Sequence, residues 1–322
     1  MHTTKDLQKK VSDIFDNKNY ITEPRDLYEP IQYSLSQGGK RLRPLLALMA
    51  CSVFKGDLSK VENPAIGLEI FHNFTLLHDD IMDQAPIRRG VPSVYKKWDT
   101  NTAILSGDTM FVLAYDYVTN SDPSFLVEVL RVFNQTAREV CEGQQYDMNY
   151  ETQEIVGVDD YVEMIRLKTA VLIAAALKIG AITAHASEED AQNMYDFGIN
   201  IGLAFQLRDD LLDAFGKQEV FGKPIGNDIV TNKKTYLYIM AYELANKQQQ
   251  AALDYAYSLN DRAEKVAGVM EVYHQLNIRE ATEKKIDEYY QKSLSYLDNV
   301  SVAHEQKSEL YSFAKGLSLR EV

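Results

Sequence analysis

The spacing of apolar residues, with few residues that break helices, is the feature that most constrains the fold of this chain. Long segments place apolar residues three and four positions apart, which is typical of amphipathic helices, and the alternating pattern of strands is missing. Only 16 glycines and 8 prolines occur in 322 residues. We therefore expect an all-α fold. Because no linker, repeat or low-complexity tract divides the chain, we expect one domain over residues 1–322.

Start and stop signals set the limits of several helices. Ser187 is followed by three acidic residues and resembles a capping box that opens a helix running to Phe215. A second helix should start after Pro64 and end where Gln84 and Pro86 break it. Further helices are expected over residues 100–119, 123–150, 247–261 and 284–298.

Charge and composition exclude some classes of partner. The formal net charge of −13 argues against nucleic acid, whose phosphates are bound by basic patches. No apolar run reaches the roughly 18 to 20 residues of a membrane span, and the opening MHTTKDLQKKVSDIF lacks the apolar segment of a secretory signal. We therefore expect a cytoplasmic protein without stable membrane insertion. Cys51 and Cys141 are expected to be reduced core residues rather than a disulfide or a metal site.

Two aspartate-rich motifs end two of the expected helices. LLHDDIMD occupies residues 76–83, and FQLRDDLLD follows about 130 residues later at 205–213. Their carboxylates are Asp79, Asp80, Asp83, Asp209, Asp210 and Asp213. On a helix, the first and third aspartates of each motif share a face and repel each other, and the helix C-terminus also disfavours negative charge. A single motif could be a solvated helix end. Two copies after long apolar approaches favour hard cations such as Mg²⁺, bridged to a diphosphate.

Basic residues that could bind such a diphosphate lie in four short segments. In GGKRLRP, glycines precede the first turn of a helix at Pro44, a setting that favours an anion site, although a solvated basic loop is the alternative. PIRRG follows the first acidic motif, and arginine can bind phosphate with two hydrogen bonds. RLKTA and FGKPIGNDIVTNKKT add lysines, but neither matches a P-loop, so ATP is not indicated.

Taken in order, GGKRLRP, LLHDDIMD, RRG, LKT and FQLRDDLLD with FGKPIGNDIVTNKKT resemble the trans-isoprenyl diphosphate synthases, the polyprenyl synthetase family of short-chain farnesyl and geranylgeranyl diphosphate synthases. The resemblance runs from about residue 33 to residue 236. It implies a bundle of about ten or more helices around a deep central cavity, and a homodimer. It also implies a prenyltransferase that condenses isopentenyl diphosphate head to tail with an allylic diphosphate. The products would be diphosphate and a trans-prenyl diphosphate, with three Mg²⁺ ions per active site.

The same resemblance assigns roles to residues of these motifs. The aspartates of both motifs would hold the metal, Asp79, Asp83 and Asp209 foremost. The residues expected to grip the allylic diphosphate are Arg88, Lys168, Lys223 and Lys233. Thr169 and Gln206 would support the allylic cation through their oxygens. Isopentenyl diphosphate would be bound by Lys40, Arg43, His72 and Arg89. A hydrogen-bonded core residue is the alternative for His72.

Residues upstream of the first acidic motif predict the length of the product. Phe74 lies five positions before Asp79, about 7 to 8 Å along the helix, and Phe71 lies about 12 Å away. Both rings can close a channel that a growing chain would enter. Thr75 is small where many farnesyl-forming members of the resembling family have a second ring. We expect a C15 to C20 product, with ordinary core packing as the alternative for both rings.

Other functions compete with this one. A longer-chain polyprenyl diphosphate synthase would use the same motifs. A terpene cyclase would also carry an aspartate-rich motif, but it needs no second diphosphate pocket, and GGKRLRP and the second DDxxD argue against it. A noncatalytic partner subunit is disfavoured because all the acidic and basic positions are intact. The starter and the fate of the product stay open.

Overall fold

The computed structural model describes residues 2–216 and 225–318. Within these ranges the chain is helical apart from loops and one hairpin of two short strands, which confirms the predicted all-α fold. The chain forms two compact units, each made of three segments. The single domain and the central cavity stay predictions. Among the described residues, no helix combines the length and apolar character needed to cross a bilayer.

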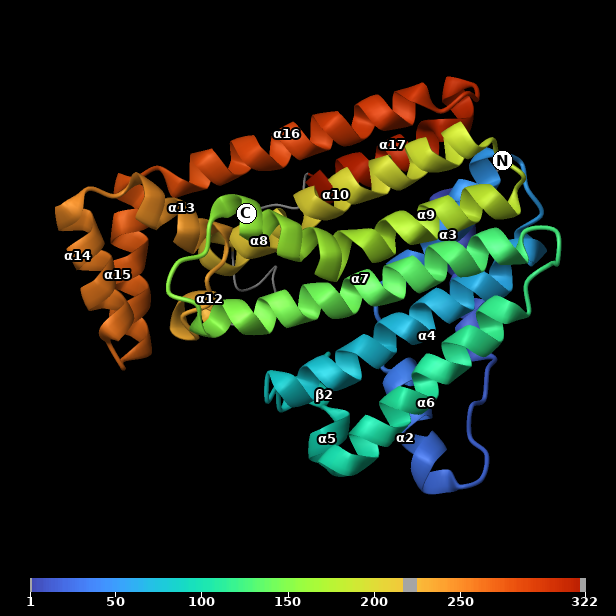
Figure 1. The fold of residues 1–322 in the computed structure, drawn as a ribbon, viewed down its shortest axis with the longest axis horizontal. Coiled ribbons are helices and arrows are strands. Elements are labelled where there is room, and N and C mark those ends of the chain that lie inside the picture. Colours follow the sequence, from blue (N-terminus) through green and yellow to red (C-terminus); the bar gives the residue numbers. More distant parts are fainter. Residues whose placement is uncertain (1, 217–224, 319–322) are drawn as a thin grey trace. The chain divides into compact units, whose positions relative to one another are not determined.

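The first unit comprises residues 1–135, 175–195 and 300–309. Its elements are α1 (Thr4–Asp16), α2 (Arg25–Ser36), α3 (Leu42–Val53), α4 (Leu58–Met82), β1 (Ile87–Arg88), β2 (Val91–Pro92), α5 (Val94–Lys97) and α6 (Thr100–Thr119). Four longer helices contribute residues to both units: α7 (Leu126–Thr152), α9 (Val171–Thr183), α10 (Glu188–Phe215) and α17 (His304–Ser318). Figure 1 shows α4 beside α6, and α3 also packs on α4.

Helix α4 carries the first acidic motif and is longer than predicted. It begins at Leu58, where the side chain of Asp57 accepts a hydrogen bond from the backbone N–H of Ser59. Pro64 lies inside the helix rather than before it, so the predicted start was wrong. The buried apolar residues on both sides of Pro64 explain this, because their packing outweighs the hydrogen bond that a proline cannot donate. The helix ends at Met82, as the sequence predicted.

The second unit comprises residues 136–174, 196–299 and 310–322. Its further elements are α8 (Val158–Ile165), the π-helical turn η1 (Arg166–Ala170), α12 (Asn227–Val230), α13 (Tyr236–Leu244), α14 (Lys247–Ser258), α15 (Arg262–Gln275) and α16 (Ile278–Asn299). In Figure 1, α14 and α15 lie side by side as a helical hairpin. Apolar residues of α8, α10, α13 and α15 form one buried core in this unit.

The predicted helix limits are close to those of the structure. The oxygen of the Ser187 side chain accepts the N–H of Asp190 at 3.0 Å and opens α10, which runs to Phe215 as expected. Helix α6 has the predicted limits, and α7, α14 and α16 differ by a few residues. The prediction for the cysteines was half wrong. Cys51 is buried, but Cys141 is exposed on α7, because its helix turns that face to solvent.

Candidate active site

The first and third aspartates of the α4 motif lie at the end of the helix. Asp83 is the capping residue, and its N–H donates to the carbonyl of Asp79 at 2.8 Å. Asp79 is half-buried and Asp83 is exposed. Both carboxylates therefore stand at the negative end of the α4 dipole, where an added cation would stabilise them.

Asp80, the second aspartate of the motif, is buried and pairs with the protein itself. Its Oδ1 accepts hydrogen bonds from Nε and Nη2 of Arg88 at 2.9 and 2.6 Å. Burial raises the pKa of Asp80, and Arg88 counteracts this shift. Arg88 lies on β1 opposite Val91, and the turn between the strands has positive φ at Arg89 and Gly90, as two-residue hairpins prefer. The hairpin, which the sequence did not predict, thus fixes Arg88 beside the acidic motif.

The loop before α3 and the hairpin turn meet. Gly38 and Gly39 have positive φ values of 73° and 119°, and the carbonyl of Gly38 accepts a hydrogen bond from Nη1 of Arg89. A Cβ on Gly39 would lie 2.9 Å from Cζ of Arg89, so only glycine lets this guanidinium lie against the loop. The structure therefore brings Arg89 beside GGKRLRP, and the resemblance assigned Arg89, Lys40 and Arg43 to the same substrate.

A buried carboxylate that the sequence analysis missed lies among these arginines. Glu69 on α4 interacts electrostatically with Arg43 and Arg89, and its Oε1 accepts a hydrogen bond from Asn73 at 3.3 Å. Burial raises the pKa of Glu69, and the arginines oppose the shift. Burial lowers the pKa of Arg43 to about 10, although Glu69 opposes this shift. The available signal was a charged residue inside the apolar run GLEIF, three positions before His72.

His72 lies on the same face of α4 as Glu69. Burial lowers its pKa well below the usual value, and the positive charges of Arg43, Arg89 and Arg88 add to the shift. His72 is therefore neutral near pH 7 and offers one N–H donor. Lys40 is exposed on the loop before α3. Together the lysine and the arginines form a positively charged cluster in the first unit, suited to an anion.

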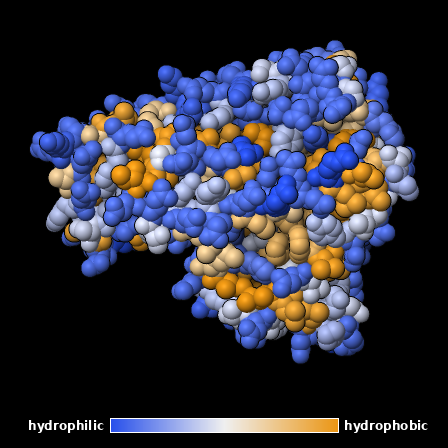
Figure 2. Space-filling model, viewed as in Figure 1, coloured by the Kyte–Doolittle hydropathy of each residue, from blue (hydrophilic) through white to orange (hydrophobic). Residues whose placement is uncertain are grey.

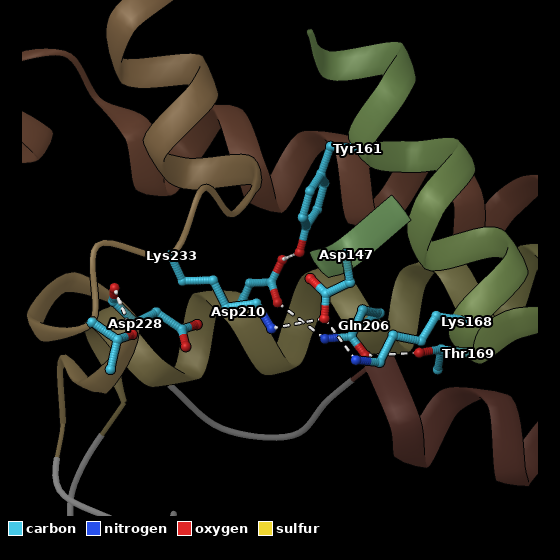
Figure 3. A network of polar contacts seen from close by, with 9 residues as sticks. Asp147, Tyr161, Lys168, Thr169, Gln206, Asp210, Asp228 and Lys233 are labelled. Atoms are coloured by element: carbon cyan, nitrogen blue, oxygen red, sulfur yellow. Dashed lines mark hydrogen bonds and ion pairs between the residues drawn. The ribbon is translucent and has the colours of Figure 1, made fainter. Parts of the chain in front are cut away.

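In the second unit, one carboxylate holds two of the predicted lysines (Figure 3). Oδ2 of Asp147, on α7, lies 2.6 Å from Nζ of Lys168 and 3.5 Å from Nζ of Lys233. Burial alone would raise the pKa of Asp147, but the two lysines hold it below its usual value. Asp147 was missed because a lone acidic residue on a polar helix face looks like an ordinary surface residue.

Lys168 reaches Asp147 because η1 and α7 approach closely. Gly143, one turn before Asp147, faces the backbone of Leu167 and Lys168, and a Cβ there would overlap the backbone nitrogen of Lys168. The wider π turn presents both Lys168 and Thr169 at this point, and such turns are frequent at functional sites.

A chain of hydrogen bonds orients Gln206 (Figure 3). Its Nε2 donates to Oδ1 of Asp210 at 3.1 Å, and the hydroxyl of Thr169 donates to its Oε1 at 3.3 Å. The hydroxyl of Tyr161 donates to Oδ2 of Asp210 at 2.5 Å. Because Asp210 takes up the NH₂ group, the carbonyl oxygen of Gln206 is turned toward Thr169. The two oxygens that the sequence assigned to one task therefore lie together.

The remaining residues of the second acidic motif differ in exposure. Asp209 is half-buried, whereas Asp213 is buried and its Oδ2 accepts the N–H of Asp228 at 2.9 Å. Burial raises the pKa of Asp210 to about 7, and the negative charge of Asp228 adds to the shift. Lys234 points elsewhere and donates to the carbonyls of Tyr150 and Glu151, at the end of α7.

Lys223 lies outside the described residues. Among the residues that are described, no group of three or more His, Cys, Asp or Glu side chains is arranged to hold a metal ion. We call the half-buried Asp79 and Asp209 and the exposed Asp83 the outward carboxylates. Metal ions held by them would need further oxygen ligands from substrate or water, as Mg²⁺ commonly has.

The two phenylalanines upstream of Asp79 belong to a larger aromatic cluster in the first unit. The Phe71 and Phe74 ring centroids are 5.6 Å apart, and the Phe74 ring is 5.2 Å from that of Phe111 on α6. Tyr115 lies 5.2 Å from Phe111 and 5.0 Å from Phe133 on α7. Phe71 is fully buried and Phe74 only partly. The hydroxyl of Thr75, the third residue predicted to set chain length, donates to the carbonyl of His72 at 2.8 Å.

Comparison with known proteins gives a family match that includes the site residues described above. The model of the polyprenyl synthetase family matches residues 24–276. The chain is 42% identical over 225 residues to a geranylgeranyl diphosphate synthase of Methanosarcina mazei, with 69% of each chain covered. It is 45% identical to a solved geranylgeranyl pyrophosphate synthase, with a TM-score of 0.94 and full coverage of both chains.

A further solved structure carries ligands. It is a geranylgeranyl pyrophosphate synthase from Corynebacterium glutamicum, complexed with isoprenyl diphosphate and magnesium. The identity is 27% and the TM-score 0.86, with 99% of this chain and 98% of that chain covered. All the acidic and basic residues described above lie inside the region matched by the family model.

Proposed function

The chain belongs to the polyprenyl synthetase family and is a prenyltransferase of the short-chain trans-isoprenyl diphosphate synthase type; from this premise we propose that it makes geranylgeranyl diphosphate. The allylic diphosphate loses diphosphate as its carbon–oxygen bond breaks. The double bond of isopentenyl diphosphate then attacks the allylic carbon, and a proton leaves. The names of the relatives and the aromatic cluster near Asp79 support a short product.

The outward carboxylates are the proposed magnesium ligands. Asp79 and Asp209 are half-buried and Asp83 is exposed, so all three are accessible enough to bind hard cations, of which the resemblance implies three per active site. Bound Mg²⁺ would neutralise the charge that develops on the departing diphosphate. Asp80, Asp210 and Asp213 are buried and accept hydrogen bonds from protein groups, so we assign them chiefly to orienting their neighbours.

The single observation that carries the proposal is the pairing of Lys168 and Lys233 with Asp147. Two lysines from segments far apart in the sequence meet at one carboxylate, as expected if both serve the same allylic diphosphate. An ammonium group has three N–H donors, which suits both lysines to binding several phosphate oxygens. The resemblance assigns Arg88 and Lys223 to the same diphosphate, and Lys223 lies outside the described residues.

Isopentenyl diphosphate would bind to the positive groups of the first unit. Arg43, Arg89 and neutral His72 surround Glu69 on α4, with Lys40 on the adjoining loop. The positive charges of Arg43, Arg89 and Lys40 outnumber the negative charge of Glu69. The group therefore keeps a net positive charge that an anion can neutralise.

The oxygens of Thr169 and Gln206 have the arrangement that their proposed role requires. Oε1 of Gln206 is held by the orientation of its amide, and Thr169 lies 3.3 Å away. Both oxygens could face the positive charge that develops on the allylic carbon. Preorganised dipoles of this kind stabilise a transition state without further reorganisation.

We also propose that the enzyme works in the cytoplasm as a homodimer. Exposed apolar residues gather on α6, where Ile104, Leu105 and Val112 are 42%, 59% and 59% exposed. Figure 2 shows apolar residues over α6 among hydrophilic ones. Val127, at the start of α7, is exposed as well. Exposed apolar residues gathered on one helix are typical of an interface between subunits.

Incubation of the purified protein with Mg²⁺, radiolabelled isopentenyl diphosphate and each of the dimethylallyl, geranyl and farnesyl starters tests the proposal. We expect a C20 diphosphate whose formation stops when the metal is chelated. A terpene cyclase would consume the allylic substrate without isopentenyl diphosphate and release a hydrocarbon. A noncatalytic subunit would give no product, and products longer than C20 would indicate the longer-chain alternative.

A further inference from the structure

Arg41 lies between two residues proposed to bind isopentenyl diphosphate, Lys40 and Arg43, but its side chain points to α1. Its Nη1 is 3.2 Å from Oδ1 of Asp16, and its Cζ lies 4.7 Å from the centre of the Phe15 ring. The Arg41 side chain is only 11% exposed. The side chain of Arg41 thus contacts helix α1, although its neighbours in the sequence are proposed to bind substrate.

The backbone conformation of Arg41 links its contact with α1 to the path of the chain between Lys40 and Arg43. Arg41 has φ 43° and ψ 48°, a left-handed conformation that a residue with a side chain keeps only when its surroundings fix it. Its carbonyl accepts the N–H of Leu45 at 3.2 Å and so opens α3. The bend at this residue turns the chain from Lys40 into α3, and Arg43 follows in the first turn of that helix, beside Glu69.

We propose that α1 is a positioning element for the isopentenyl diphosphate site, and that Phe15 anchors Arg41 so that Lys40 and Arg43 are held in their binding geometry. This inference rests on the proposed function. Helix α1 precedes residues 24–276, which the family model matches, so the family match does not cover it.

The two contacts that Arg41 makes with α1 differ in strength. Asp16 has a side chain that is 67% exposed, so water and salt screen its ion pair with Arg41. Phe15 is 6% exposed and the guanidinium that covers it is largely removed from water, which strengthens a cation–π contact. The aromatic ring is therefore the main anchor and Asp16 the lesser one.

The first experiment replaces the ring but keeps the apolar packing. Phe15→Leu should raise KM for isopentenyl diphosphate roughly three- to tenfold and leave kcat and KM for the allylic substrate unchanged. Phe15→Tyr keeps a π face and should restore the KM. Asp16→Asn should change it less than about twofold. Asp13→Asn, the same change on an exposed residue one turn earlier, is the matched control and should have no effect.

A double-mutant cycle separates anchoring from general stability. Arg41→Gly removes the guanidinium but permits the left-handed backbone, and it should raise KM for isopentenyl diphosphate. If Phe15 acts through Arg41, adding Phe15→Leu to Arg41→Gly should raise the KM no further. Effects that multiply in the double variant overturn the proposal. So does a Phe15→Leu variant that loses kcat or thermal stability while its KM for isopentenyl diphosphate is unchanged.

Calorimetric titration with isopentenyl diphosphate alone keeps this inference separate from the proposed function. If the wild-type protein forms no product with any starter, the proposed function fails. The anchor is still tested, because Phe15→Leu should weaken this binding by the same factor. Equal binding by the wild-type protein and Phe15→Leu overturns it.

Discussion

Replacing Phe74 with alanine is expected to lengthen the product by one isoprene unit. The Phe74 ring is packed at 5.6 Å from Phe71 and 5.2 Å from Phe111, so its removal opens the space on the Asp79 side of these two rings. Phe71 lies three residues before Phe74 on α4, so it is about 4.5 Å further from Asp79 by helix rise. That is close to the length that the four-carbon backbone of one isoprene unit adds. One further unit should therefore fit before the chain meets Phe71.

The Phe74→Ala variant should remain folded. Truncation of a fully buried phenylalanine costs about 3 to 5 kcal/mol of stability, and Phe74 is only partly buried, so its cost should lie at or below the lower end. Phe71 is fully buried and packs against Phe74, Phe111 and Phe133, so its removal should cost more. The single variant is therefore the cleaner measurement, and the double variant with Phe71→Ala should add a second unit.

Product length is measured by chromatography of the dephosphorylated, radiolabelled products. Phe125→Ala, which truncates a buried phenylalanine of the first unit outside the aromatic cluster, is the matched control. It should lose stability without changing the product. An active Phe74→Ala and Phe71→Ala double variant with the wild-type product distribution would refute the assignment, and both rings would then be ordinary core residues.

Four further predictions test other parts of the proposal. Asp79→Ala or Asp209→Ala should lower kcat by about two to three orders of magnitude with unchanged helix content by circular dichroism, and near-normal turnover would remove either residue from the metal site. Arg43→Ala should raise KM for isopentenyl diphosphate about tenfold or more, and an unchanged value would make Arg43 only a structural partner of Glu69. Gly143→Ala should destabilise the protein by about 1 to 3 kcal/mol in denaturant unfolding and weaken allylic binding, because its methyl group would displace Lys168. Leu105→Asp should yield monomers by light scattering, and an intact dimer would place the interface elsewhere.

Helical periodicity and capping signals predicted the elements that depend on local sequence. The limits of α6 and the Ser187 cap of α10 are of this kind, because a few neighbouring residues determine them. Pro64 misled the prediction for α4, since tertiary packing outweighed a local signal. The resemblance assigned Arg89 and GGKRLRP to one substrate, and Arg89 does lie against the carbonyl of Gly38.

Residues that act through distant partners could not be predicted. Asp147 is recognisable as a site residue only from its ion pairs with Lys168 and Lys233, which lie 21 and 86 positions later in the sequence. The buried orientation of Asp80 and Asp210 was likewise invisible, because each motif spells three equivalent aspartates. The buried Asp80 pairs with Arg88 and the buried Asp210 with Tyr161, and both partners lie outside the motifs.

The π turn η1 behaves as a one-residue insertion that the protein has kept. A π turn takes up one residue more than an α-helical turn, so everything after it is rotated by about 100° relative to a regular helix. Deleting one residue within 166–170 would make the helix regular, yet it would also swing the Thr169 hydroxyl off the oxygen of Gln206. A length change that regular helix geometry favours should therefore be rare among active descendants of this sequence.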